Sequence, residues 1–203
     1  MELENALDQI AEIHRQMSLT RIFRGYRAST TFCTAMIALA AGVVQGIWLP
    51  NAAHEPKQFV DLWVAVAFIC LAVVGSQMVR RFRRTDSPVQ RQLTMHAMQQ
   101  FLPCIVIGGM VTFLLRNFAH QTIWLLPGLW SIFFGLGIFA SRQLLPQSII
   151  FVGAFYLLWG LICMGGCGAI SSLSPWVVAF PFAVGQSAAA LILHWSLERS
   201  HES

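Results

Sequence analysis

The stretch from Gln143 to Leu197 contains no Asp, Glu, Lys or Arg, and this feature restricts the fold more than any other. The rest of the chain is also apolar: of its 203 residues, 56% are hydrophobic and 11% are charged, whereas soluble domains carry about 25% charged residues. A water-soluble domain of this length buries only part of the surface that its unfolded chain exposes. We therefore expect an integral membrane protein, for which the bilayer acts as the solvent.

The chain divides into six segments that are long enough to cross a bilayer, which takes about 20 mostly apolar residues. Charged residues separate the first four segments, and a Gly/Ser-rich stretch that ends at Pro175 splits the uncharged run into two. Helices are expected because a lipid-exposed segment must satisfy its own backbone hydrogen bonds. The predicted fold is an all-α polytopic membrane bundle of three helical hairpins, with spans at about residues 30–49, 62–79, 99–115, 123–140, 144–164 and 176–195.

Basic residues are distributed unequally between the two sides of this predicted bundle. Two of the 13 Lys and Arg residues, Lys57 and Arg116, fall on one side, and the other eleven fall on the opposite side. Cytoplasmic loops of membrane proteins carry the excess of Lys and Arg, so the N-terminus and the C-terminus are both predicted to be cytoplasmic. The eleven are Arg15, Arg21, Arg24, Arg27, Arg80, Arg81, Arg83, Arg84, Arg91, Arg142 and Arg199.

Tryptophans are expected at the opposite, outer interface, where indole rings prefer to lie. The second helix of each predicted hairpin opens with one, which is consistent with an internal repeat of three hairpins, although local preferences at helix starts explain the same pattern. The four tryptophans expected at the outer interface are Trp48, Trp63, Trp124 and Trp176, of which the last three open the second helices.

Residues 1–28 are predicted to form a cytoplasmic amphipathic helix, and residues 198–203 a cytoplasmic tail. Acidic residues near the start argue against a cleavable signal peptide. The helix has three possible roles: docking on its own bundle, self-association, or binding another membrane or cytoplasmic protein. Its apolar face has helical spacing and consists of Leu3, Leu7, Ile10, Ile13 and Met17.

A cluster of arginines follows the second span, at Arg80, Arg81, Arg83 and Arg84. Such a cluster fixes topology and is a candidate site for lipid headgroups, anionic ones in particular. Next, Ser87 and Pro88 are typical of a helix start, and the helix they begin is predicted to run into the third span. Nucleic-acid binding is not expected, because the basic residues lie at membrane edges rather than on one face interleaved with aromatics.

No charged residue lies in the middle of any predicted span, which argues against a proton- or sodium-driven transporter. Neutral polar residues instead gather towards the cytoplasmic helix ends. One interpretation is a polar cavity open to the cytoplasm, and the other is hydrogen bonding between helices. The candidate substrate-binding residues are Gln77, Gln147, Gln186, Ser187 and His194.

Cys163 and Cys167 lie four residues apart beside Met164, and soft ligands of this kind suit Cu(I). Close packing of small residues explains the same spacing. The histidines fall in loops or near helix ends and do not form pairs within the apolar core, as membrane haem sites do. No cofactor is therefore predicted, with haem or copper kept as alternatives, and no catalytic residue is assigned because the carboxylates lie at the membrane edges.

Glycines are expected at close helix contacts, which is the common use of small residues in lipid. Gly42 and Gly46 have the spacing that joins two helices or two chains. The other expected contacts are at Gly108, Gly109, Gly135, Gly137, Gly153, Gly160, Gly185 and Ala189.

Three segments, Phe23-Arg24-Gly25-Tyr26-Arg27, Gln100-Phe101-Leu102-Pro103-Cys104 and Leu126-Pro127-Gly128-Leu129-Trp130, resemble a family of uncharacterised bacterial multi-pass inner-membrane proteins with six helices. The resemblance covers nearly the whole chain and implies a bacterial inner membrane, but no activity. We expect a non-enzymatic membrane component that acts through partner binding or self-association. The alternatives are a small permease or binding protein for a neutral or apolar solute, and a haem or metal redox membrane protein.

Overall fold

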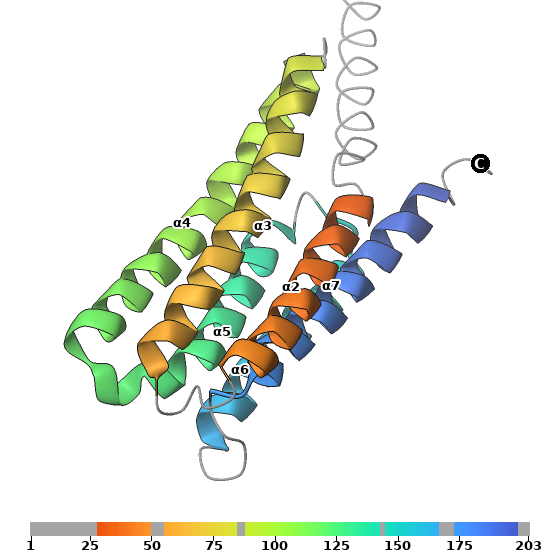
Figure 1. The fold of residues 1–203 in the computed structure, drawn as a ribbon. Coiled ribbons are helices and arrows are strands. Elements are labelled where there is room, and N and C mark those ends of the chain that lie inside the picture. Colours follow the sequence, from red (N-terminus) through yellow and green to blue (C-terminus); the bar gives the residue numbers. More distant parts are fainter. Residues whose placement is uncertain (1–27, 50–54, 85–87, 143–144, 167–172, 199–203) are drawn as a thin grey trace, which may run out of the picture.

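The structure, a computed structural model, describes residues 28–49, 55–84, 88–142, 145–166 and 173–198. These residues form six α-helices and one 3-10 helix, and there is no strand among them (Figure 1). The predicted amphipathic helix at residues 1–28 and the tail lie almost wholly outside the described residues. The elements are α2 (Ala28–Trp48), α3 (Pro56–Arg84), α4 (Pro88–Phe118), η1 (His120–Leu125), α5 (Leu126–Ala140), α6 (Ile149–Gly165) and α7 (Pro175–Glu198).

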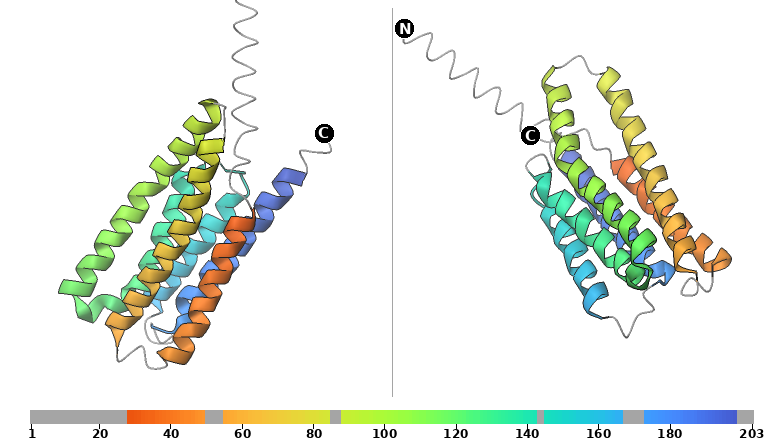
Figure 2. Two further views of the ribbon diagram at one scale, coloured as in Figure 1. Left: turned by 45° about the horizontal axis from the view of Figure 1, so that its top comes forward. Right: turned by 90° about the vertical axis from the view of Figure 1, so that its left-hand side faces the viewer.

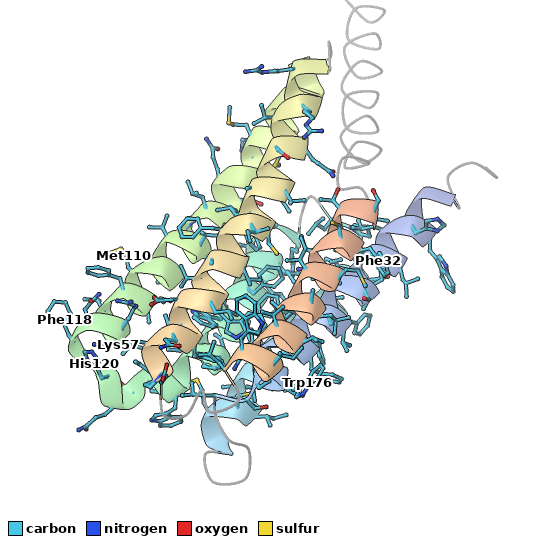
Figure 3. All side chains as sticks on the ribbon, viewed as in Figure 1. Phe32, Lys57, Met110, Phe118, His120 and Trp176 are labelled. Atoms are coloured by element: carbon cyan, nitrogen blue, oxygen red, sulfur yellow. The ribbon has the colours of Figure 1, made fainter. Side chains whose placement is uncertain are left out.

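Five of these helical segments are long and apolar enough to cross a membrane, and α6 is a shorter apolar helix of 17 residues. Large apolar side chains project outward around the bundle, including Phe32 on α2, Met110 and Phe118 on α4, and Trp176 on α7 (Figure 3). A soluble protein rarely exposes apolar surface on this scale. The prediction of a helical bundle with several membrane-span-like helices is therefore confirmed, whereas the layout as three hairpins and the orientation stay predictions.

Several helices begin or end beyond the predicted spans. The helix α3 starts at Pro56 and continues through the arginines to Arg84, and α4 starts at Pro88, as the proline signal predicts. Counting apolar residues finds only the part of a helix that matches the bilayer, so the predicted span left out the polar turns at both ends of α3. The helix α6 starts later than predicted because Pro146 lies in a turn, in which its carbonyl accepts a hydrogen bond from the Ile149 amide at 2.9 Å.

The most extensive helix pair is α2 with α7, which pack side by side (Figures 1 and 2). Small residues allow their backbones to approach closely: a Cβ added at Gly42 would lie 2.6 Å from the Cβ of Ala179. Ala35 and Ala38 continue the same buried stripe along α2. Without a hydrophobic driving force between helices in lipid, such close van der Waals packing is a main source of association.

Glycines also join α5 to α6, and they do so at two levels. A Cβ added at Gly160 would lie 2.7 Å from the carbonyl oxygen of Gly128, and one added at Gly135 would lie 3.0 Å from the carbonyl oxygen of Gly153. The two glycines on each helix are seven residues apart, so they share a face. The predicted close contacts at Gly135, Gly153 and Gly160 are confirmed.

Aromatic rings fill the space where α5, α6 and α7 meet. The ring centroids of Phe134 and Tyr156 lie 4.9 Å apart, and Phe182 lies 5.2 Å from Phe134 and 5.4 Å from Tyr156. A Cβ added at Gly185 would lie 2.5 Å from the Tyr156 ring, so this glycine makes room for the tyrosine. The middle of this half of the bundle is a packed core.

The helices α3 and α4 lie on one flank of the bundle (Figures 1 and 2). Only 17% of the α3 span and 6% of the α4 span is buried inside the protein, against 44–50% of the spans in α2, η1–α5 and α7. The main neighbour of α3 is α2, and that of α4 is α5. The α3–α4 hairpin, by which we mean Pro56–Arg84 with Pro88–Phe118, is therefore the least covered part of the structure.

Candidate functional site

The predicted cavity residues lie on three elements and are not all brought together. Gln186 and Ser187 are half-buried on α7, and His194 is exposed near its end. Gln147 is exposed in the turn before α6. Gln77 is exposed on α3, and α2 packs between α3 and α7, so Gln77 faces α2 rather than the α7 residues. The cavity stays a prediction. The alternative interpretation, hydrogen bonding between helices, has a direct example at Gln77.

Three threonines that sequence reasoning passed over lie at the start of α2, which packs on both α3 and α7. The Thr30 hydroxyl donates a hydrogen bond to Gln77 Oε1 and so joins α2 to α3. Thr34 donates to the Thr31 carbonyl at 2.7 Å. Thr31 itself is buried, and its Oγ1 has no partner. The clustering of the three threonines in one apolar span was the sequence signal that could have identified them.

The candidate copper ligands are only partly described. Cys163 is half-buried on α6 and lies against α5, 3.5 Å from the position of a Cβ at Gly128. Cys167 lies outside the described residues. Within the part of the chain that the structure describes, no group of three or more His, Cys, Asp or Glu could hold a metal ion. The copper and haem alternatives stay untested.

The arginine cluster lies at the end of α3, and we call this end of the bundle the arginine end. Arg80 and Arg83 are exposed there. Arg81 and Arg84 belong to the same helix, but their side chains lie outside the described residues. Exposed guanidinium groups at a helix end fit the predicted contact with lipid headgroups, which stays a prediction.

A buried glutamine, which sequence reasoning missed, joins three segments at the other end of the bundle. Gln45 on α2 is fully buried; its Oε1 accepts a hydrogen bond from Trp63 Nε1 at 2.7 Å, and its Nε2 donates to the Leu173 carbonyl at 3.1 Å. Trp63 is only 5% exposed, so its indole serves this contact rather than lying on the bundle surface. The sequence feature that could have identified Gln45 is a lone glutamine within an apolar run.

Indole N–H groups link the two helices of each predicted hairpin at the same sequence separation of 18 residues. Besides Trp63 with Gln45, Trp130 donates to Thr112 Oγ1 at 2.9 Å, and Trp159 donates to the Val177 carbonyl at 3.1 Å. Hydrogen bonds between membrane helices are worth about 1 kcal/mol each. In this structure, tryptophan side chains therefore join the two helices of each predicted hairpin.

Two glycines of the α3–α4 hairpin touch no other part of the described structure. A Cβ added at Gly109 on α4 or at Gly75 on α3 would have no atom within 4 Å, and the predicted close contact at Gly109 is therefore wrong within one chain. Gly109 is flanked at helical spacing by exposed large side chains. We call this set, Leu102, Ile105, Gly109 and Phe113, the α4 outer face.

Two buried polar atoms, one on α4 and one directly after α5, have no hydrogen-bond partner. Ser141 is 6% exposed and its Oγ has no hydrogen-bond partner, and Gln100 Oε1 is likewise buried without a partner. In lipid or in a protein interior, an unpaired polar atom costs about 1–3 kcal/mol.

Comparison of the chain with known protein families, with curated proteins and with solved structures finds no match. The resemblance to bacterial six-helix inner-membrane proteins therefore stays a prediction. Function has to be argued from the geometry alone.

Proposed function

We propose that the protein is a non-enzymatic component of a bacterial inner membrane that acts by assembling with other membrane helices, first of all those of a second copy of the chain. One observation carries this proposal: the least covered helices of the structure bear glycines with no neighbour within 4 Å. The arginine distribution supports a cytoplasmic position for both termini in this proposal. The predicted role of residues 1–28 in binding a partner remains part of this proposal.

The argument rests on what glycine does in a helix. An interior glycine destabilises a helix by about 1 kcal/mol relative to alanine, so it needs a compensating gain. At Gly42, Gly128 and Gly160 close backbone contact supplies that gain within the chain. At Gly109 none of the described residues does. A contact with another helix on the α4 outer face supplies it in the same way.

The α4 outer face is suited to pairing with a second copy of itself. Gly109 leaves a notch, and Leu102 and Phe113, 57% and 63% exposed, project on either side of it. A surface that offers both a notch and large side chains is self-complementary, as a two-fold symmetric interface requires. No charged residue interrupts this face between Gln99 and Leu115.

The packed aromatic core favours assembly over solute transport. Phe134, Tyr156 and Phe182 occupy the middle of the bundle, where a permease needs a path or a pocket. The permease and redox alternatives lack a comparable supporting observation in the described residues.

The test counts copies of the full-length protein in lipid bilayers by single-molecule photobleaching. We expect the wild-type chain to associate, and Gly109→Leu to weaken association about tenfold, because a leucine blocks close approach worth about 1.4 kcal/mol. Ile107→Leu is the control, since Ile107 is an exposed side chain of α4 outside the α4 outer face. Wild-type chains that stay single at high density, or an unchanged Gly109→Leu variant, would contradict the proposal.

A further inference from the structure

The arginine end of the α3–α4 hairpin is a basic surface without an acidic partner among the described residues. Between Val79 and Gln99 the chain has five arginines and one aspartate, a net formal charge of +4. Arg80 and Arg83 are exposed on α3, and neither forms an ion pair with a described residue. Like charges at helical spacing repel one another. The five arginines are Arg80, Arg81, Arg83, Arg84 and Arg91.

Topology and helix dipoles do not account for all of these charges. Arginines at the C-terminal end of α3 suit both the excess of basic residues in cytoplasmic loops and the negative end of the helix dipole. Arg91, however, is the fourth residue of α4, and no acidic residue lies in the first turn of that helix. A positive charge near a helix N-terminus is unfavourable, so a negative group close to Arg91 would stabilise this end of the hairpin.

The tip of the hairpin also stands beyond the level of lipid headgroups. The apolar span of α4 begins at Gln99, whereas the helix begins at Pro88, about 16 Å further along its axis. Headgroups extend only about 5–8 Å from the hydrocarbon core on each side of a bilayer. The end of α3 and the start of α4 accordingly extend past the start of α2 (Figure 1). A protein segment outside the bilayer can therefore reach arginines that headgroups reach poorly.

The first 12 residues of the chain, which lie outside the described residues, carry the opposite charge. They contain four acidic residues and no Lys or Arg, a net side-chain charge of −4. In the predicted helix, Glu4, Asp8 and Glu12 form a stripe at four-residue spacing. Glu4 and Asp8 have no basic residue three or four positions away, so they repel each other instead of pairing within the segment. These carboxylates need a basic partner from elsewhere.

The path of the chain keeps this acidic segment close to the arginines. The segment precedes α2, and Thr30 in the first turn of α2 bonds to Gln77 on α3. Arg83 lies only about 9 Å further along α3 than Gln77. Residues 13–27 span about 22 Å as a helix and about 50 Å when extended, so either form is long enough. A tether of this length gives an effective concentration in the millimolar range, at which weak ion pairs suffice for docking.

We propose that residues 1–12 dock on the arginine end of the α3–α4 hairpin of the same chain. The acidic stripe faces the guanidinium groups, and Leu7 lies toward Val79, which is 50% exposed and one turn before Arg83. The docked segment neutralises the basic surface, and an outside partner of residues 1–28 has to displace it from the arginines. The contact is made within one chain and does not depend on the assembly proposed above.

The test measures the distance between spin labels at positions 5 and 96 of the full-length protein by pulsed electron resonance. The labels are introduced as non-natural amino acids because the chain has five cysteines of its own, and position 96 is exposed on α4. The protein is diluted in phosphatidylcholine bilayers until the chains are single. We expect a short, narrow distance population. Asp8→Lys should lower the ratio of docked to undocked chains about threefold, because one exposed ion pair contributes little, and adding Arg83→Glu should restore the ratio.

Glu2→Lys is the matched control, because it makes the same change of charge on the opposite flank of the apolar residues. It should leave the ratio unchanged, whereas high salt should lower it by screening exposed charges. A broad distribution in the unsubstituted chain, or equal losses in Asp8→Lys and Glu2→Lys, would overturn the proposal. So would a short distance found only between chains that carry one label each, which would assign the contact to a second copy. Loss of the short distance in bilayers that contain phosphatidylglycerol would assign the arginines to lipid headgroups and would equally overturn docking within the chain.

Discussion

The α5–α6 pair and the α3–α4 hairpin use glycine in opposite ways. In α5 and α6, glycines face glycines, and the backbones meet at distances that exclude any side chain. In α3 and α4, Gly75 and Gly109 face open space, and nearly the whole hairpin is uncovered. The difference teaches that a small residue in a membrane-type helix does not by itself mark a contact within the chain: the glycines between α5 and α6 make one, and Gly75 and Gly109 do not.

The two regions also differ in what holds them. Van der Waals contact joins α5 to α6, whereas the hairpin is joined to the rest by buried residues of α3 (Phe59, Val60 and Trp63) and by hydrogen bonds such as that from Thr30 to Gln77. Within the hairpin, Arg116 makes a bidentate ion pair with Asp61 at 2.8 and 2.7 Å. We therefore expect substitutions in the glycine-packed pair to unfold the protein, and those in the hairpin to change its position or its association.

The largest effect is expected from Gly160→Ala. The new methyl group would meet Ile132 Cγ1 at 2.6 Å and the Gly128 carbonyl oxygen at 2.7 Å, and a backbone oxygen cannot move aside. Overpacking of this kind lowers the free energy of unfolding by about 1–3 kcal/mol or more. Reversible unfolding in mixed micelles measures it. Gly109→Ala is the matched control, and it should be neutral or stabilising by up to about 1 kcal/mol. Similar losses for both variants would remove the distinction between the two regions.

A smaller loss is expected from Gln45→Leu, which tests how the hairpin is attached. The substitution leaves the Trp63 indole and the Leu173 carbonyl unpaired in a buried place. We expect about 1–2 kcal/mol lower stability, because an orphaned polar group costs more than its hydrogen bond contributes. Tryptophan fluorescence should shift as Trp63 becomes more mobile. An unchanged unfolding curve would show that packing alone attaches α3.

Thr112→Val should cost less, about 0.5–1 kcal/mol, because it removes one acceptor from the Trp130 indole while keeping the shape of the side chain. Thr122→Val is the control, since the Thr122 hydroxyl bonds only to the nearby Ala119 carbonyl. The same micelle unfolding assay compares the two. Equal losses would mean that the Thr112–Trp130 bond contributes nothing of its own.

The smallest change in stability is expected from Asp61→Asn. Its partner Arg116 is partly exposed, and exposed ion pairs contribute little. The hairpin, however, has few other contacts between its two helices at this end, so the distance between α3 and α4 should broaden. Paired spin labels on the two helices measure that distance by pulsed electron resonance. A narrow, unchanged distance distribution would show that the ion pair does not hold the hairpin closed.

Sequence patterns anticipated the helices better than their contacts. The proline at position 88 marked the start of α4, and glycine spacing marked the α5–α6 contact at Gly135 and Gly153. The same glycine pattern was wrong for Gly109, because spacing along one helix does not say whether a second helix faces it. Trp63 was expected at an interface by its type, yet it lies buried against Gln45.

The sequence by itself determined that the fold is helical and that its surface suits a membrane. Composition, the placement of charges and the length of apolar runs can all be taken directly from the order of residues. The tertiary structure decided which helix flank is left uncovered and which polar atoms are orphaned. Gln45 and Leu173 illustrate the reason: they are far apart in the chain, and only the packing of the helices brings the glutamine side chain to the Leu173 carbonyl and so leaves neither group unpaired.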